Sequence, residues 1–216
     1  MNGSVLAGAG GLGFVGVAVV VNVMYLRGRL PIPGASATSG FDEIVADFAA
    51  ARIPMRRPTV LAPASWLLLT VFAAGMLAEA WGRGSGQNAW AVVGMAGVVM
   101  QNVTFAGVEA LRLATAEAAV RAPRTVAGFW TMSTVLFGFN QSFLATALLG
   151  FTTSGIGVAP TWLAVIGYGS AVLLFVSASA SPYSTREGGR FGVVGLVGWS
   201  GWILWILVSS IALIVP

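Results

Sequence analysis

Two carboxylates, Glu79 and Glu109, lie in or beside long apolar segments and could act as acids within a membrane. Placing an ionisable side chain at that depth is costly, which makes such a residue a candidate functional group. An apolar pocket favours the protonated carboxyl, the form that can donate a proton to a substrate. The two residues are therefore the candidate catalytic acids.

Each candidate acid also has an arginine about one helical turn further on, which offers a second interpretation. Arg83 follows Glu79 by four residues, and Arg112 follows Glu109 by three. Side chains at these spacings form ion pairs on a helix surface, and pairing keeps a carboxylate ionised. The sequence leaves open whether the two acids face a cavity or only pair with these arginines.

Amides and aromatic rings in the apolar segments could complete a binding site around Glu109. Asn102 precedes Glu109 by two helical turns and shares its face, from which it could hydrogen-bond to an amide of a neighbouring helix. Amides would orient a polar head and aromatic faces would stabilise a developing cation, although interhelical amides also serve simply in packing. The candidate substrate-binding residues are Asn102, Asn140, Gln141, Phe105, Trp130, Tyr168 and Trp202, with Asn140 or Gln141 the expected partner of Asn102.

Three absent residue types exclude several classes of chemistry. The chain has no Cys, no His and no Lys, since all eleven basic residues are Arg. Thiolate nucleophiles, imidazole ligands for zinc or haem, and Schiff bases are therefore excluded. We expect no cofactor and no metal. The net charge of +4 comes from arginines in connecting segments, so nucleic acid is not an expected partner.

The composition is that of an integral membrane protein whose surroundings are the lipid bilayer. Hydrophobic residues make up 57% of the 216 residues and charged residues 8%, against about 25% charged in soluble domains. Apolar runs of about 20 residues, enough to cross a bilayer as a helix, recur along the chain. The sequence predicts an all-α polytopic membrane protein, one transmembrane domain over residues 1–216, with six spans at about 5–26, 61–82, 89–111, 126–150, 160–180 and 192–214.

The segments between the spans carry further predictions. The third helix should continue through Glu117 and stop before Pro123, while 83–88 and 181–190 read as a tight turn and a polar loop. In the first long loop, Phe41, Ile44, Val45 and Phe48 share one helical face, which predicts a short amphipathic helix over about 40–52 on the membrane surface.

A glycine-rich stretch over residues 8–13 matches the dinucleotide-binding pattern G-x-G-x-x-G. The strand before it and the acidic residue after it, which that mechanism needs, are missing. Small residues at Ala7 and Gly11, and at Ala9 and Gly13, instead predict close packing between helices.

The arginines predict the orientation of the chain. Ten of them lie in or beside the connections after the first, third and fifth spans, and one, Arg83, follows the second. Cytoplasmic loops carry the excess of arginine, so these odd-numbered connections should be cytoplasmic. We expect a multi-pass protein of the inner (plasma) membrane with both termini outside.

The fourth to sixth spans resemble a widespread group of small, uncharacterised multi-span proteins of high-GC bacteria. The resembling features are residues 136–145, with Phe139, Asn140 and Gln141, the small-residue fifth span, and the tryptophans of residues 198–205. The chain is more weakly similar to integral-membrane terpene cyclases, in which intramembrane acids protonate a prenylated substrate. That similarity points to Glu79 and Glu109, but spans four to six contain no acid, which departs from the family.

Three functions follow from these residues. The first is a membrane enzyme acting on a lipophilic small molecule, including isoprenoid substrates, by acid-initiated chemistry such as terpene cyclisation. The second is a transport or lipid-handling protein in which Asn102, Glu109 and Asn140 line a pathway. The third is a non-catalytic membrane subunit whose polar groups hold helices together. The number of subunits is left open.

Overall fold

The computed structural model describes residues 3–32, 40–81, 84–155, 159–187 and 190–215, with the backbone alone over 182–187 and 190–191. All regular structure in these ranges is helical, and they contain no strand. Six helices are long and apolar enough to cross a membrane. The predicted all-α fold with six spans is therefore confirmed, and the chain has the architecture of a multi-pass membrane protein.

The predicted spans correspond to six long helices, and the short amphipathic helix is present as α2. The spans are α1 (Gly3–Gly28), α3 (Arg56–Ala80), α4 (Ser85–Arg121), α5 (Val126–Ser154), α6 (Thr161–Glu187) and α7 (Arg190–Ile214). The short elements are α2 (Phe41–Ala51) and a 3-10 turn, η1 (Pro123–Thr125).

Three helix ends test the predicted connections. Helix α4 ends at Arg121, two residues before Pro123, as expected from its polar extension. It begins at Ser85, however, inside the predicted turn, directly after Gly84, whose φ of 138° suits glycine. Helix α6 continues to Glu187, so the prediction of a loop from 181 was wrong. An apolar run marks only the part of a helix that lies in the hydrocarbon layer. The helix can continue beyond it into the polar region, because its backbone hydrogen bonds are formed within the helix.

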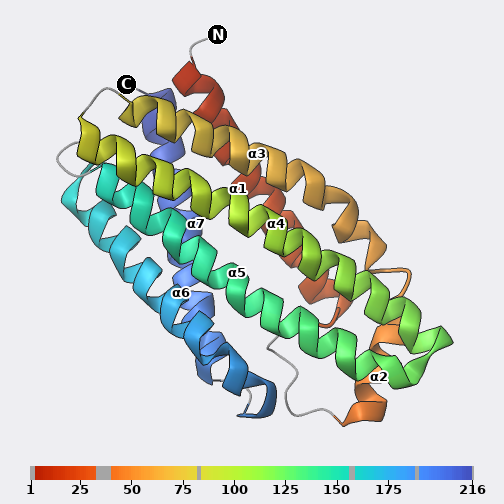
Figure 1. Ribbon diagram of the computed structural model, residues 1–216. Helices are drawn as coiled ribbons and strands as arrows, with labels where there is room; N and C mark the ends of the chain where they lie inside the picture. Colours follow the sequence, from red (N-terminus) through yellow and green to blue (C-terminus); the bar gives the residue numbers. More distant parts are fainter. Residues whose placement is uncertain (1–2, 33–39, 82–83, 156–158, 188–189, 216) are drawn as a thin grey trace.

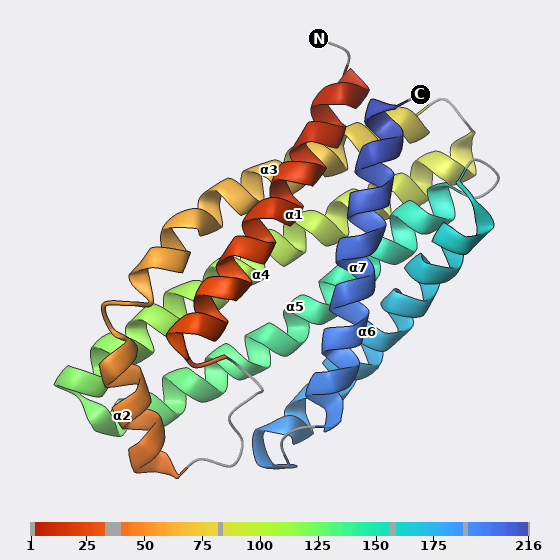
Figure 2. The ribbon, with the colours of Figure 1, turned by 180° about the vertical axis from the view of Figure 1, so that it is seen from behind.

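The six long helices form a closed ring in chain order (Figures 1 and 2). Each packs against the next, with α1 against α3, and α7 returns to pack against α1. Phe14, Phe72, Phe151, Trp202 and Trp205 are among the buried side chains that fill the ring. The cavity left among these side chains measures about 10 Å³, so the centre of the ring is packed rather than open.

Glycines allow several of these helices to approach closely. A Cβ added at Gly8 of α1 would lie 2.6 Å from the carbonyl oxygen of Ser210 in α7, and one at Gly11 would meet the ring of Phe72. The glycine-rich stretch is therefore helix packing, as predicted. Of the residues singled out there, Ala7 and Gly11 are buried, whereas Ala9 is exposed.

Helix α2 covers the end of the bundle opposite the two termini (Figures 1 and 2). Its Phe48 is fully buried and meets Trp130 of α5 edge to face, with 5.0 Å between ring centroids. Phe48 of the predicted amphipathic face thus packs against the bundle, Ile44 and Val45 are half-buried, and Phe41 is exposed. The location of this helix on the membrane surface stays a prediction. We call this the arginine-rich end, because it carries Arg27, Arg29, Arg52, Arg56, Arg57, Arg112, Arg121 and Arg124.

Candidate functional site

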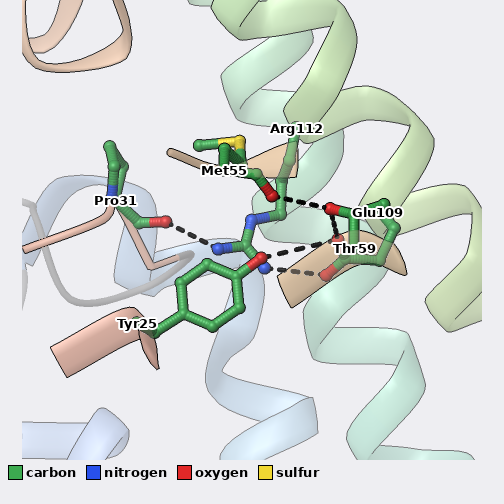
Figure 3. A network of polar contacts seen from close by, with 6 residues as sticks. All are labelled: Tyr25, Pro31, Met55, Thr59, Glu109 and Arg112. Carbon is green, nitrogen blue, oxygen red and sulfur yellow. Dashed lines mark hydrogen bonds and ion pairs between the residues drawn. The ribbon is translucent and has the colours of Figure 1, made fainter. Parts of the chain in front are cut away.

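Glu109 and Arg112 of α4 form a buried ion pair near the arginine-rich end (Figure 3). Nη1 of Arg112 lies 2.8 Å from Oε1 of Glu109, and the residues are 4% and 5% exposed. The spacing of three residues places both side chains on one face of the helix. The structure thus shows the pairing that the sequence offered as one of two interpretations.

Groups from three other segments complete a network around this pair (Figure 3). The Thr59 hydroxyl of α3 donates to Oε2 of Glu109 at 3.0 Å, and Nη2 of Arg112 donates to the Pro31 carbonyl at 3.0 Å. The Tyr25 ring of α1 lies under the guanidinium, 4.0 Å from its central carbon, and the Tyr25 hydroxyl approaches Glu109 at 3.5 Å. The network therefore ties α1, the segment after it, α3 and α4 together.

The chemistry of this network is that of a structural ion pair. Glu109 accepts hydrogen bonds from Tyr25, Thr59 and Arg112, so both of its carboxylate oxygens are engaged within the network. Removing one partner of such a pair would leave a buried charge uncompensated, at a cost of about 3–5 kcal/mol.

Glu79, the other candidate acid, lies at the opposite end of the bundle. It is exposed in the last turn of α3, near the end where the chain termini lie (Figure 1). Its expected partner Arg83 falls outside the described residues. The structure does not bring Glu79 and Glu109 together.

Asn102 points to a different helix from the one expected. Its side-chain amide donates to the Thr70 hydroxyl at 2.9 Å and to the Trp66 carbonyl at 3.2 Å, both on α3. The expected bond to Asn140 or Gln141 of α5 was wrong, because Asn102 lies on the side of α4 that faces α3. The amide joins these two helices.

The two candidate amide residues of α5, Asn140 and Gln141, have different surroundings from those of Asn102. Asn140 is 3% exposed, and its Oδ1 has no hydrogen-bond partner in the described part of the chain. Gln141 reaches α7, where a Cβ added at Gly195 would lie 2.9 Å from the Gln141 Nε2 atom. Gln141 therefore packs between α5 and α7.

The aromatic candidates are distributed over separate packing sites. Trp202 packs in the centre of the ring against Phe14, at 5.2 Å between centroids, while Trp130 contacts α2. The Tyr168 hydroxyl shares a hydrogen bond of 3.1 Å with Thr153. Phe105 is half-buried on α4. With the centre of the ring filled, the candidates do not line one common cavity.

Sequence reasoning missed a groove at the arginine-rich end. It measures about 620 Å³ and lies where the end of α2 meets α3 and α4. Its lining consists of Arg52, Arg56, Thr59, Val60, Leu113, Ala114 and Glu117. Cationic, hydroxyl and aliphatic side chains thus meet in one open depression.

Charge within the groove is only partly paired. The Arg52 guanidinium binds the Glu117 carboxylate through two nitrogens, with 3.0 Å between Nη2 and Oε1, and Arg121 lies 3.2 Å from the same carboxylate. Hydrogen bonding to Glu117 raises the pKa of Arg52. Arg56 is exposed, and its side chain forms no ion pair or hydrogen bond with the residues described, although its positive charge helps to lower the pKa of Glu117. One cation of the groove is therefore available to a ligand.

Thr59 connects the groove with the buried network. Its side chain lines the groove, and its hydroxyl donates to Glu109. Glu117 and Arg121 are four residues apart on α4, a spacing that allows an ion pair on one helix face. The pair between Arg52 and Glu117 joins residues 65 positions apart, which no local pattern reveals.

Comparison with family models, with curated proteins and with solved structures gives no match to this chain. The resemblances to small multi-span bacterial proteins and to integral-membrane terpene cyclases therefore stay predictions. The geometry of the groove and of the buried network is the basis for assigning a function.

Proposed function

We propose that this chain is a lipid-handling membrane protein that binds an amphiphile in the groove between α2, α3 and α4. The observation that carries the proposal is the composition of the groove, in which arginines stand beside aliphatic side chains. Val60 is 76% exposed, although it is a large apolar residue. The polar group of an amphiphile could bind the arginines, and its hydrocarbon chain could pack against the aliphatic side chains.

The orientation of the protein is part of the proposal. Arginine accumulates on the cytoplasmic side of multi-pass proteins, so we place the arginine-rich end in the cytoplasm and both termini outside the inner (plasma) membrane. The groove would then lie beside the headgroups of the cytoplasmic leaflet, from which a lipid could enter it sideways.

The geometry gives less support to acid-initiated chemistry such as terpene cyclisation. A reaction of that kind needs a carboxyl group open to a substrate cavity, and ligand cavities typically measure about 300–1,000 Å³. The centre of the ring leaves about 10 Å³, and Glu109 lines neither this space nor the groove. The large open space lies instead beside Arg56.

Photolabelling tests the proposed function. The purified full chain would be mixed with a phospholipid that carries a photoactivatable group on its acyl chain, irradiated, and mapped by mass spectrometry. We expect label on the α3 and α4 peptides that contain Val60 and Leu113. Ala114→Trp, which fills the groove, should abolish that label.

The matched control is Ala96→Trp, at an exposed position of the same helix outside the groove. It should leave the label on these peptides unchanged. Label spread evenly around the bundle, and unaffected by Ala114→Trp, would contradict the proposal.

A further inference from the structure

We propose that the groove selects amphiphiles with an anionic phosphate headgroup, and that Arg56 is the residue that binds this headgroup. The inference rests on the proposed function and names the class of lipid. It starts from the balance of charge in the groove. The only acid in its lining, Glu117, forms ion pairs with Arg52 and Arg121, whereas the Arg56 side chain forms no direct ion pair among the described residues and acts on Glu117 only from a longer distance.

The order of residues along the two helices matches the polarity of a lipid. On α3, Arg56 precedes Val60 by one turn, and on α4 Glu117 follows Leu113 by one turn. The two helices run in opposite directions (Figure 1), so both charged residues lie nearer the arginine-rich end than their aliphatic neighbours. A headgroup at Arg56 would leave its hydrocarbon chain beside Val60 and Leu113.

The chemistry of the guanidinium group favours phosphate as the ligand. Arginine presents several donors in a planar fork that bonds two phosphate oxygens at once, and such charge-assisted bonds are about twice as strong as neutral ones. Arg56 is the first residue of α3, and its side chain is exposed at the end of the helix. Thr59, one turn later, adds a hydroxyl group to the lining.

The neighbouring Arg57 provides a matched control. It is exposed at the same end of the bundle but does not line the groove. Arg56→Gln and Arg57→Gln each remove one positive charge, so general attraction to anionic membranes falls equally in both. Only a specific headgroup contact distinguishes the two variants.

Competition against the photolabel tests the inference. The competitors are phosphatidylglycerol, phosphatidylcholine and diacylglycerol with identical acyl chains, and inorganic phosphate alone. We expect phosphatidylglycerol to displace the label best, and Arg56→Gln to weaken this competition about tenfold, the effect of one lost charged hydrogen bond. Arg57→Gln should change it little, and Arg56→Lys should restore part of the preference.

Each remaining outcome overturns a defined claim. If the three lipids compete equally, or Arg57→Gln acts as strongly as Arg56→Gln, the headgroup selectivity is wrong while amphiphile binding stands. If inorganic phosphate competes as well as phosphatidylglycerol, the ligand is a free anion and not a lipid. If Ala114→Trp leaves the labelling unchanged, the proposed function fails before selectivity is measured.

Discussion

The guanidinium group of Arg112 lies over the ring of Tyr25, with 4.0 Å between its central carbon and the ring centroid. The contact joins α4 to the last turns of α1, and both residues are buried. A cation held against an aromatic face gains about 2 kcal/mol or more when both groups are buried away from solvent. Together with the bond to Glu109, it explains how this arginine is accommodated inside the protein.

Replacing Arg112 by methionine should strongly destabilise the protein. The change leaves Glu109 buried without its cation, which costs about 3–5 kcal/mol. The double variant Glu109→Leu with Arg112→Met should recover much of this loss, because no charge is then left unpaired. Thermal unfolding of the purified variants in detergent measures both effects. A double variant less stable than Arg112→Met would contradict this account of the pair.

Replacing Phe48 by alanine should release α2 from the bundle. The side chain is fully buried against Trp130, and removing a buried phenylalanine costs about 3–5 kcal/mol. Limited proteolysis within residues 41–51 measures the release. Phe41→Ala is the control, since Phe41 is 46% exposed on the same helix. Equal cleavage of the two variants would show that α2 does not depend on this contact.

Alanine at Gly150 should destabilise the contact between α4 and α5. A Cβ there would meet the backbone of Gly94 and of Trp90, and overpacking of this kind costs about 1–3 kcal/mol. At an open helical position the same change should stabilise by about 1 kcal/mol, because alanine is the better helix former. Gly128 is such a position, with no neighbour near its added Cβ, so Gly128→Ala should raise the unfolding temperature.

Reporter fusions should place the C-terminus outside the cell. A phosphatase that is active only outside the cytoplasm, fused after Pro216, should be active, and the same reporter inserted between 182 and 190 should be inactive. Because ten of eleven arginines favour this orientation, exchanging any single one should not invert it. An inactive fusion at Pro216 would reverse the orientation and place the groove at the outer leaflet.

The spans were predictable because a bilayer imposes a simple condition on sequence. A helix needs a run of about 20 apolar residues to cross the bilayer, and such runs can be recognised in the sequence, so the six long helices follow from composition along the chain. Pro123 marked the end of the long polar extension of α4, since proline disfavours helix in the residue before it. The predicted end of α6 was wrong, because the polar residues from 181 onward were taken to form a loop, whereas the helix continues through them to Glu187.

The groove and the buried network beside it could not be predicted, because both depend on contacts between residues that are distant in the sequence. Arg112 and Glu109 are neighbours on one helix, and their pairing is readable from a spacing of three. Thr59, Pro31 and Tyr25 join them only once the ring has formed. The choice of Asn102 between two flanking helices also depends on the rotation of α4, which a nearly uniform apolar sequence does not specify.

The closed ring has a consequence for how the protein is assembled. Neighbouring helices in the ring are neighbours in the chain, so each new helix can dock on the previous one as it leaves the ribosome. The seam between α1 and α7 is the exception, because it joins the first helix to the last. Until Ser210 reaches Gly8, the glycine face of α1 stays uncovered on this side. A chain without α7 would therefore leave this face of α1 without its helix partner.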